Sequence, residues 1–187
     1  HGNYGAMTSM ANQARGPGFA GGHAFAMSEP MKISFQLLKR QMTLPAYDKQ
    51  SIENIKDNHS IFIAAKPGNQ ELPPQELSRL SDAMLEQLAE LKKEHGPFTI
   101  TSATGRAEWD EEPSFMLTGV PESARPHIHR IADKFGQESI GISDAGSDEV
   151  KFESPEGEDK GGFGGMEFDP NAQYSTDFPT GQRLTFK

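Results

Sequence analysis

Three adjacent carboxylates follow the only tryptophan of the chain: Asp110, Glu111 and Glu112 come directly after Trp109. Paired carboxylates can act as general acid and base when their environments separate their pKa values. The indole of Trp109 could serve as a platform for a ligand. The alternative is that the carboxylates cap a helix or form salt bridges, while Trp109 covers the core. Because no histidine or nucleophile accompanies them, we predict a ligand loop at Trp109, Glu111 and Glu112 and no catalytic residue.

Two histidines, His127 and His129, flank Ile128 and raise the question of a metal site. On a strand their side chains would point to the same side. On a helix, residues two apart point to different faces and cannot easily share one ion. The surrounding pattern is helical, so we interpret them as solvent-facing histidines beside a core isoleucine. The sequence therefore predicts no metal ligand and no cofactor.

Three further segments contain groups that can do chemistry, but none has the required spacing. Ser114 lacks the glycines of a nucleophile elbow. The run Gly161–Gly165 has no following Lys-Ser/Thr and fits neither phosphate-loop pattern, so it is read as a hinge. The turn at residues 144–149 carries carboxylates without the calcium-loop spacing, which leaves weak divalent binding as the alternative.

The overall charge and composition exclude several classes of protein. The 187 residues include no cysteine, which removes disulfide scaffolds and thiolate metal sites. The formal net charge is −9, whereas a nucleic-acid-binding protein normally shows a basic patch. No apolar run approaches the roughly 20 residues that a membrane helix needs. We therefore expect no direct contact with nucleic acid and no membrane span.

Hydrophobic periodicity predicts an α+β domain between residues 60 and 153. Apolar residues at three- and four-residue steps predict a helix that opens at the proline pair of residues 73–76 and ends at a left-handed cap at Gly96. A second helix is expected at residues 122–135. Short apolar or alternating runs predict strands at residues 60–65, 98–101, 114–120, 139–142 and 150–152, the last of them at an edge of the sheet. A loop is expected at residues 104–112. The order β-α-β-β-α-β, with one extra strand, is typical of a ferredoxin-like split βαβ sandwich with two helices on one face.

The same block resembles domain-of-unknown-function family 3293, which is found in small bacterial proteins. The resemblance is carried by Phe62–Asn69, by the Trp-Asp-Glu-Glu-Pro-Ser-Phe run at 109–115 and by Phe135–Ile140. It extends over about residues 60–152. The chain departs from the family pattern at Ala65-Lys66-Pro67, where family members tend to have an aromatic residue and Asn-Pro. The resemblance implies membership of a family whose function is itself unknown.

Outside this block, the sequence predicts a flexible glycine-rich arm at residues 1–28, a connector at 29–59 and an acidic, glycine-rich C-terminal arm at 154–187. Glycine-rich arms cannot recover the cost of backbone ordering from their own contacts, so we expect them to be extended and to lie against other protein chains. Flexible methionine and aromatic side chains suit irregular grooves. The expected anchoring residues are Met7, Met10, Met27, Phe163, Phe168, Tyr174 and Phe178.

These features predict a non-catalytic structural or interaction component of a large assembly, anchored by its arms to other chains. A capsid- or tail-associated accessory protein of a bacteriophage would fit, located in a virion or in the bacterial cytoplasm. Two alternatives remain open. One is an acidic inhibitor or decoy that binds a basic host protein. The other is a small enzyme that uses the Trp109 loop.

Overall fold

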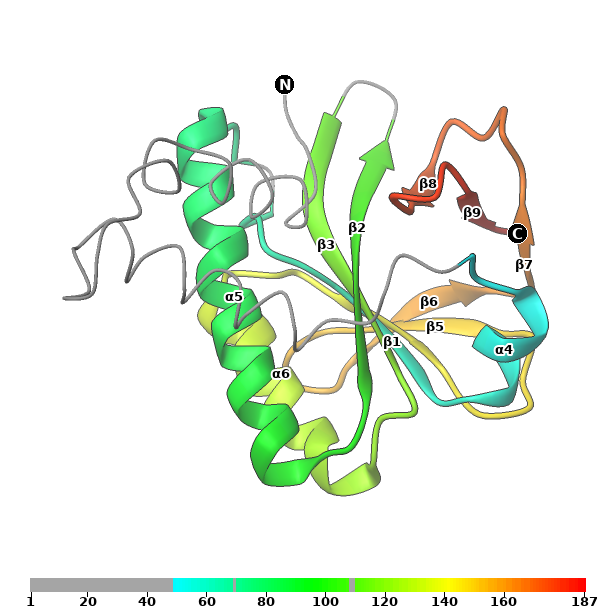
Figure 1. Ribbon diagram of the computed structural model, residues 1–187, viewed down its shortest axis with the longest axis horizontal. Helices are drawn as coiled ribbons and strands as arrows, with labels where there is room; N and C mark the ends of the chain where they lie inside the picture. The colour runs from blue at the N-terminus through cyan, green and yellow to red at the C-terminus, as the bar shows by residue number, and fades with distance from the viewer. Residues whose placement is uncertain (1–48, 69, 108–109) are drawn as a thin grey trace, which may run out of the picture.

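The computed structural model describes residues 49–68, 70–107 and 110–187, and these residues form one antiparallel sheet with helices against it (Figure 1). The nine strands follow the order β6-β5-β4-β1-β3-β2-β8-β9-β7. The strands are β1 (Ser60–Ala64), β2 (Thr99–Ala107), β3 (Asp110–Thr118), β4 (Ile140–Ser143), β5 (Val150–Glu153), β6 (Asp159–Phe163), β7 (Met166–Phe168), β8 (Ser175–Asp177) and β9 (Arg183–Phe186). The helices are α4 (Ile52–Asp57), α5 (Pro74–His95), α6 (Arg125–Lys134) and the short 3-10 helix η1 (Glu122–Ala124).

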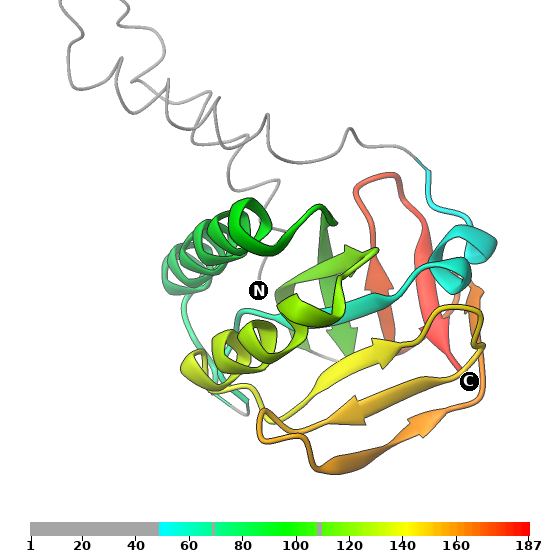
Figure 2. The same cartoon turned by 90° about the horizontal axis from the view of Figure 1, so that it is seen from below.

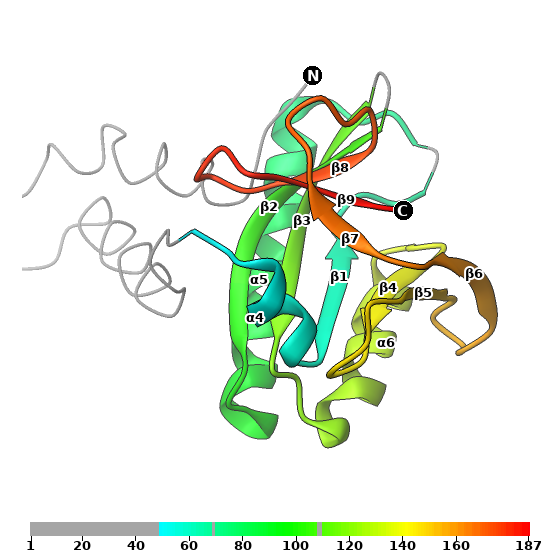
Figure 3. The same cartoon turned by 90° about the vertical axis from the view of Figure 1, so that its right-hand side faces the viewer.

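Helices α5 and α6 lie side by side on one face of the central strands (Figures 1 and 3). Helix α5 begins at a proline pair, as predicted, and Gly96 ends it. The sequence suggested a left-handed cap at Gly96, but its φ is −77°. Glycine is needed there for another reason: a Cβ at this position would lie 2.2 Å from the carbonyl oxygen of Lys92.

The core between these helices and the sheet contains most of the apolar residues that the helical and strand patterns singled out. Met84, Leu88 and Leu91 of α5 are buried against the strands, and Leu80 packs at the margin. Burying such side chains is the main favourable term that holds a helix on a sheet. The strand residues in this core include Ile61, Ile63, Phe115, Leu117 and Ile140.

The prediction of a ferredoxin-like sandwich is wrong, because the sheet has nine strands, and the C-terminal residues that were predicted to form an arm belong to it. Strand β5 was expected at an edge, yet β6 pairs with it on the outer side. On the other side of the sheet, β8 pairs with β2 and is followed by β9 and β7. Residues 154–187 are therefore part of the domain rather than an arm. The local glycine-rich pattern did not indicate strands here, because these strands are stabilised by backbone pairing with strands distant in the sequence.

The sheet curls until its two outermost strands come together, as a nearly closed barrel does (Figure 2). These strands, β6 and β7, are consecutive in the chain and are joined only by Gly164 and Gly165. The backbone N–H of Gly164 donates to the Lys187 carbonyl at 2.6 Å, and the Lys187 N–H donates to the Gly165 carbonyl at 2.9 Å. The expected hinge at Gly161–Gly165 is thus the point where the barrel nearly closes.

A second apolar core fills the concave face of the sheet, opposite α5 and α6. Its buried members are Ile55, Ala103, Met116, Phe178 and Leu184. Phe62, Phe168 and Phe186 are among the half-buried residues that pack against it. Helix α4, which lies in the predicted connector at 29–59, contributes Ile52 and Ile55 to this core.

The hairpin of β2 and β3 is longer than predicted. The sequence placed a loop from Thr104 to Glu112, but the pairing continues from Thr99 with Thr118 to Ala107 with Asp110. Strand β8 pairs with the same end of β2 and supports it from the other side. Glu111 and Glu112, which were predicted to lie in a ligand loop, therefore belong to a strand.

Candidate functional site

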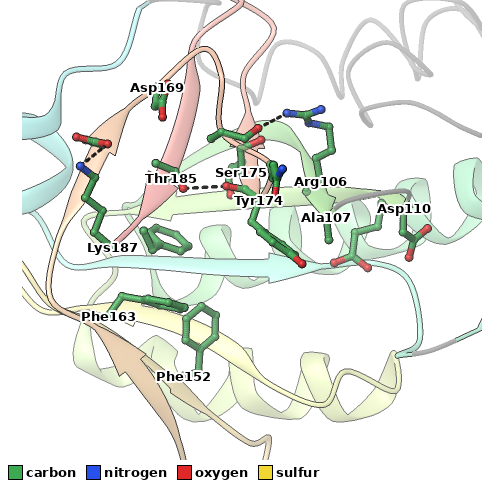
Figure 4. Close-up of a pocket in the computed structure, with 17 residues that line it drawn as sticks. Arg106, Ala107, Asp110, Phe152, Phe163, Asp169, Tyr174, Ser175, Thr185 and Lys187 are labelled. Atoms are coloured by element: carbon green, nitrogen blue, oxygen red, sulfur yellow. Dashed lines mark hydrogen bonds and ion pairs between the residues drawn. The ribbon is translucent and has the colours of Figure 1, made fainter.

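A cavity of about 740 Å³ opens on the concave side of the sheet (Figure 4). This volume lies within the range of about 300–1,000 Å³ that is usual for small-molecule sites. Strands β2 and β3 form one wall, and strands β5 to β9 with their connections form the others. The lining residues are Gly105, Arg106, Ala107, Asp110, Glu112, Phe152, Phe163, Glu167, Asp169, Ala172, Gln173, Tyr174, Ser175, Thr176, Thr185, Phe186 and Lys187.

One side of the cavity is aromatic. The ring of Phe152 lies edge-on to Phe163 and Phe186, with centroids 5.8 Å and 6.0 Å away. Phe163 and Phe186 stack at 6.2 Å. Figure 4 shows Phe152 and Phe163 on one side of the hollow and Arg106 and Asp110 on the other, with Tyr174 reaching between them. Phe163 and Tyr174 are also the large hydrophobic side chains that are exposed in the described part of the chain, at 46% and 57%.

The opposite side of the cavity carries charged groups from β2 and β3, and Lys66, which follows β1, lies behind it. Ser60 pairs with Thr118 and Ala64 with Ser114. Lys66 follows two residues after the end of this ladder and acts electrostatically on Glu112 of β3. The N–H of Ala65 donates to the Pro113 carbonyl at 2.9 Å, in agreement with this register. The Lys66 ammonium is buried and forms an ion pair with the exposed carboxylate of Asp110.

Glu112 is the group with the most perturbed acidity at this site. Burial raises the pKa of its carboxyl to about 7, while Lys66 opposes the rise and Asp110 adds to it. Its cross-strand partner is Gly105, where an added Cβ would lie only 3.3 Å from the Glu112 Cγ. Among the described residues, no hydrogen-bond donor contacts its carboxyl group. Near neutral pH, Glu112 therefore exists in both protonation states and can accept or release a proton.

Three segments far apart in the sequence meet at Lys66. The side-chain amide of Gln137 donates to the Lys66 carbonyl, and Asp110 holds the Lys66 ammonium. Next to them, the N–H of Gly68 donates to the Gly136 carbonyl at 3.1 Å. These residues belong to the three motifs on which the family resemblance depends. The turn after β1, the start of β3 and the end of α6 are thereby fixed as one unit beneath the polar side of the cavity.

The basic side chains of the cavity wall have carboxylate partners. Arg106 lies 3.5 Å from Asp177 and also donates to the Ala172 carbonyl. Lys187 pairs with Glu167 at 2.6 Å. Among the residues that the structure describes, Glu112 and Asp169 are the lining carboxylates that form no ion pair.

The predicted site residues are only partly brought together. Glu112, Phe163 and Tyr174 line the cavity, whereas Glu111 lies on β3 outside its lining. Phe168 is half-buried in the second core and Phe178 is 4% exposed, so neither can be an arm anchor. Trp109, Met7, Met10 and Met27 lie outside the described residues.

Sequence reasoning missed Lys66, Arg106, Phe152 and Phe186 as site residues. A usable signal was present for one of them, because Lys66 follows directly on a buried apolar run, where an ammonium needs a partner. Phe152 and Phe186 had no such signal, since they meet only when the sheet curls. Arg106 had no such signal either, because it lies beyond the predicted end of β2, in the part of the strand that pairs with β8.

The histidine pair does not share one environment. His127 stacks on His95 with centroids 4.2 Å apart, and burial is the main cause that lowers its pKa. His129 lies 3.1 Å from the Glu153 carboxylate and 3.0 Å from the Arg125 carbonyl, so the prediction that it faces solvent is wrong. Within residues 49–68, 70–107 and 110–187, no three His, Asp or Glu side chains gather as metal ligands.

Comparison with known proteins adds no relative: no protein-family model matches the chain, and the search of curated proteins gives no match. The resemblance to family 3293 stays a prediction. In the described part of the chain, the helices are too short or too polar to span a bilayer.

Proposed function

We propose that this domain binds a small amphipathic organic molecule in the cavity on the concave side of its sheet. The observation that carries the proposal is the coincidence of two features at one cavity. Its aromatic side holds Phe163 and Tyr174, which leave large apolar surface in solvent. Its polar side presents Glu112, a half-buried carboxyl without a hydrogen-bond donor among the described residues.

Both features are costly in an isolated protein and become favourable when a ligand is bound. Exposed aromatic surface gains free energy on burial, at roughly 25 cal/mol per Å². A half-buried carboxyl gains a hydrogen bond that would otherwise be missing. The proposed ligand therefore has an apolar body that covers Phe163 and Phe186 and a polar end that reaches Glu112.

Fluorescence titration with the neutral probe N-phenyl-1-naphthylamine tests this proposal. The probe brightens in an apolar site, and we expect saturable binding to the wild-type chain. Phe163→Ala removes exposed apolar wall and should weaken binding about tenfold. Leu80→Ala, at the margin of the helix-side core, is the control and should bind as wild type. Absence of saturable binding, or equal loss in both variants, contradicts the proposal.

The role in a larger assembly stays a second proposal, favoured by the same exposed side chains, Phe163 and Tyr174. Its C-terminal part needs revision, because residues 166–187 pair within the sheet of their own domain. The N-terminal part depends on residues 1–28, which lie outside the described range. Size-exclusion chromatography with light scattering tests this role. Larger species that Phe163→Ser reduces to monomer support it, and a monomer at all concentrations contradicts self-assembly through this surface.

A further inference from the structure

Acidic side chains outnumber basic ones in the lining of the cavity, which bears on the charge of the ligand. Four acidic side chains line the cavity, Asp110, Glu112, Glu167 and Asp169, against two basic ones, Arg106 and Lys187. The buried Lys66 adds a third positive charge behind the wall, but Asp110 already pairs with it. The cavity therefore presents an excess of negative charge to whatever enters it.

The two basic side chains of the lining are already held in ion pairs, so the excess negative charge is concentrated at Glu112 and Asp169. Arg106 is held by Asp177 and the Ala172 carbonyl, and Lys187 is held by Glu167. An anionic ligand would have to compete with these carboxylates for each cation. By contrast, a cationic ligand meets Glu112 without displacing any ion pair among the described residues.

The aromatic side of the cavity has the same preference. The faces of aromatic rings carry partial negative charge and attract organic cations. Tyr174 reaches toward the side of the cavity where Asp110 lies, so apolar and acidic groups line one continuous hollow (Figure 4). A strongly hydrated inorganic ion would gain little from these rings, whereas an amine on an apolar body uses both sides.

From these contacts we propose that the ligand is an organic cation, with an ammonium group at the Glu112 carboxylate and an apolar or aromatic body against Phe163 and Phe186. This inference rests on the proposed small-molecule function and specifies its ligand class. Charge-assisted hydrogen bonds of this kind are about twice as strong as neutral ones. Glu112 thus favours a positively charged group on the ligand, and the aromatic side favours an apolar body.

Three probes of matched shape separate charge from shape: 2-phenylethylammonium, 2-phenylethanol and 3-phenylpropionate. Their affinities for the full chain are measured at pH 8 by NMR titration of the aromatic resonances. We expect the ammonium to bind about tenfold more tightly than the alcohol, as one charge-assisted hydrogen bond would give. The carboxylate should bind most weakly of the three.

Two variants assign the selectivity to one side chain. Glu112→Gln keeps the shape of the side chain and should bring the ammonium and the alcohol to equal affinity. Glu111→Gln lies on the same strand outside the cavity lining and should keep the tenfold preference.

Failure of this inference differs from failure of the proposed function. If the alcohol or the carboxylate binds the wild type as tightly as the ammonium, or if Glu112→Gln keeps the preference, the cation proposal is overturned while a binding site remains. If none of the three probes perturbs the cavity residues at millimolar concentration, both proposals are overturned.

Discussion

Lys66 and Asp110 form an ion pair of unequal burial: 5% of the lysine side chain is exposed, against 58% of the aspartate side chain. The ammonium is thus fixed below the cavity wall, and its partner stays in contact with solvent. Both members of the pair act on the carboxyl group that we place at the centre of the site: Lys66 lowers the pKa of Glu112 and Asp110 raises it, beside the larger effect of burial.

Removing the Lys66 charge should raise the pKa of Glu112 above its present value of about 7. Lys66 is the group that opposes the effect of burial, so Lys66→Met leaves desolvation and Asp110 to act together. The titration of the Glu112 carboxyl carbon, followed by ¹³C NMR, measures this shift. Lys160→Met, which removes an exposed lysine on β6, should leave the Glu112 titration where it is. An unchanged Glu112 pKa in Lys66→Met would disprove the coupling.

Glu112→Gln should stabilise the fold at alkaline pH. The pKa of Glu112 is raised from 4.5 in the unfolded chain to about 7 in the folded one, so its contribution is fully favourable below pH 4.5 and is lost as pH rises through 7. Glutamine cannot ionise and removes this dependence. Allowing for partial solvent screening, we expect a gain of about 1–3 kcal/mol at pH 8. Urea unfolding at pH 4 and pH 8 measures it, and equal stability of both proteins at pH 8 would contradict the expected gain.

Leu88→Ala should destabilise the domain by about 2–5 kcal/mol, because it leaves a cavity under α5. Leu88 is fully buried between this helix and the sheet. The exposed Glu86 on the same helix supplies the control, since Glu86→Ala should change stability by less than about 0.5 kcal/mol. Denaturant unfolding of both variants checks this core, and a Leu88→Ala protein as stable as the parent would refute it.

Leu184→Ala should cost about 2–5 kcal/mol as well, although it lies near the end of the chain. Leu184 is fully buried in the second core beside Phe178 and Met116. A mobile arm would predict no loss of stability from this change. Thermal unfolding compared with Asn171→Ala, an exposed position in the β7–β8 connection, separates the two views. If both variants melt together with the parent, residues 166–187 are not part of the folded domain.

The sequence predicts those elements whose pattern is local. Helix α5 has apolar residues at helical spacing and a proline pair at its start, and the structure confirms it from Pro74 to His95. Strand β6 contains Asp159, Lys160 and three further residues, all of them exposed. It has no buried alternating face, and pairing with β5 is what makes it a strand.

The same distinction explains what the sequence indicated about the site. Glu112 could be identified because it belongs to a run of three adjacent carboxylates beside the only tryptophan of the sequence. Its partner Lys66 lies 46 positions away, and the ion pair of Lys66 with Asp110 joins residues 44 positions apart. The local pattern indicates that the Lys66 ammonium needs a partner, but it does not indicate that the partner is Asp110. Phe152 and Phe186 likewise meet only because the sheet curls and brings β5 and β9 together.

Aromatic ¹³C–¹H NMR of the full chain, titrated with the neutral probe 2-phenylethanol, tests the binding site most directly, because it does not depend on the charge of the ligand. We predict saturable shift changes confined to Phe152, Phe163, Tyr174 and Phe186, which line the cavity. Phe98 and Phe115, buried on the helix side of the sheet, should remain unchanged and serve as internal controls. Shifts that are absent at saturating probe, or that affect Phe98 and Phe115 equally, would contradict a ligand site on the concave face.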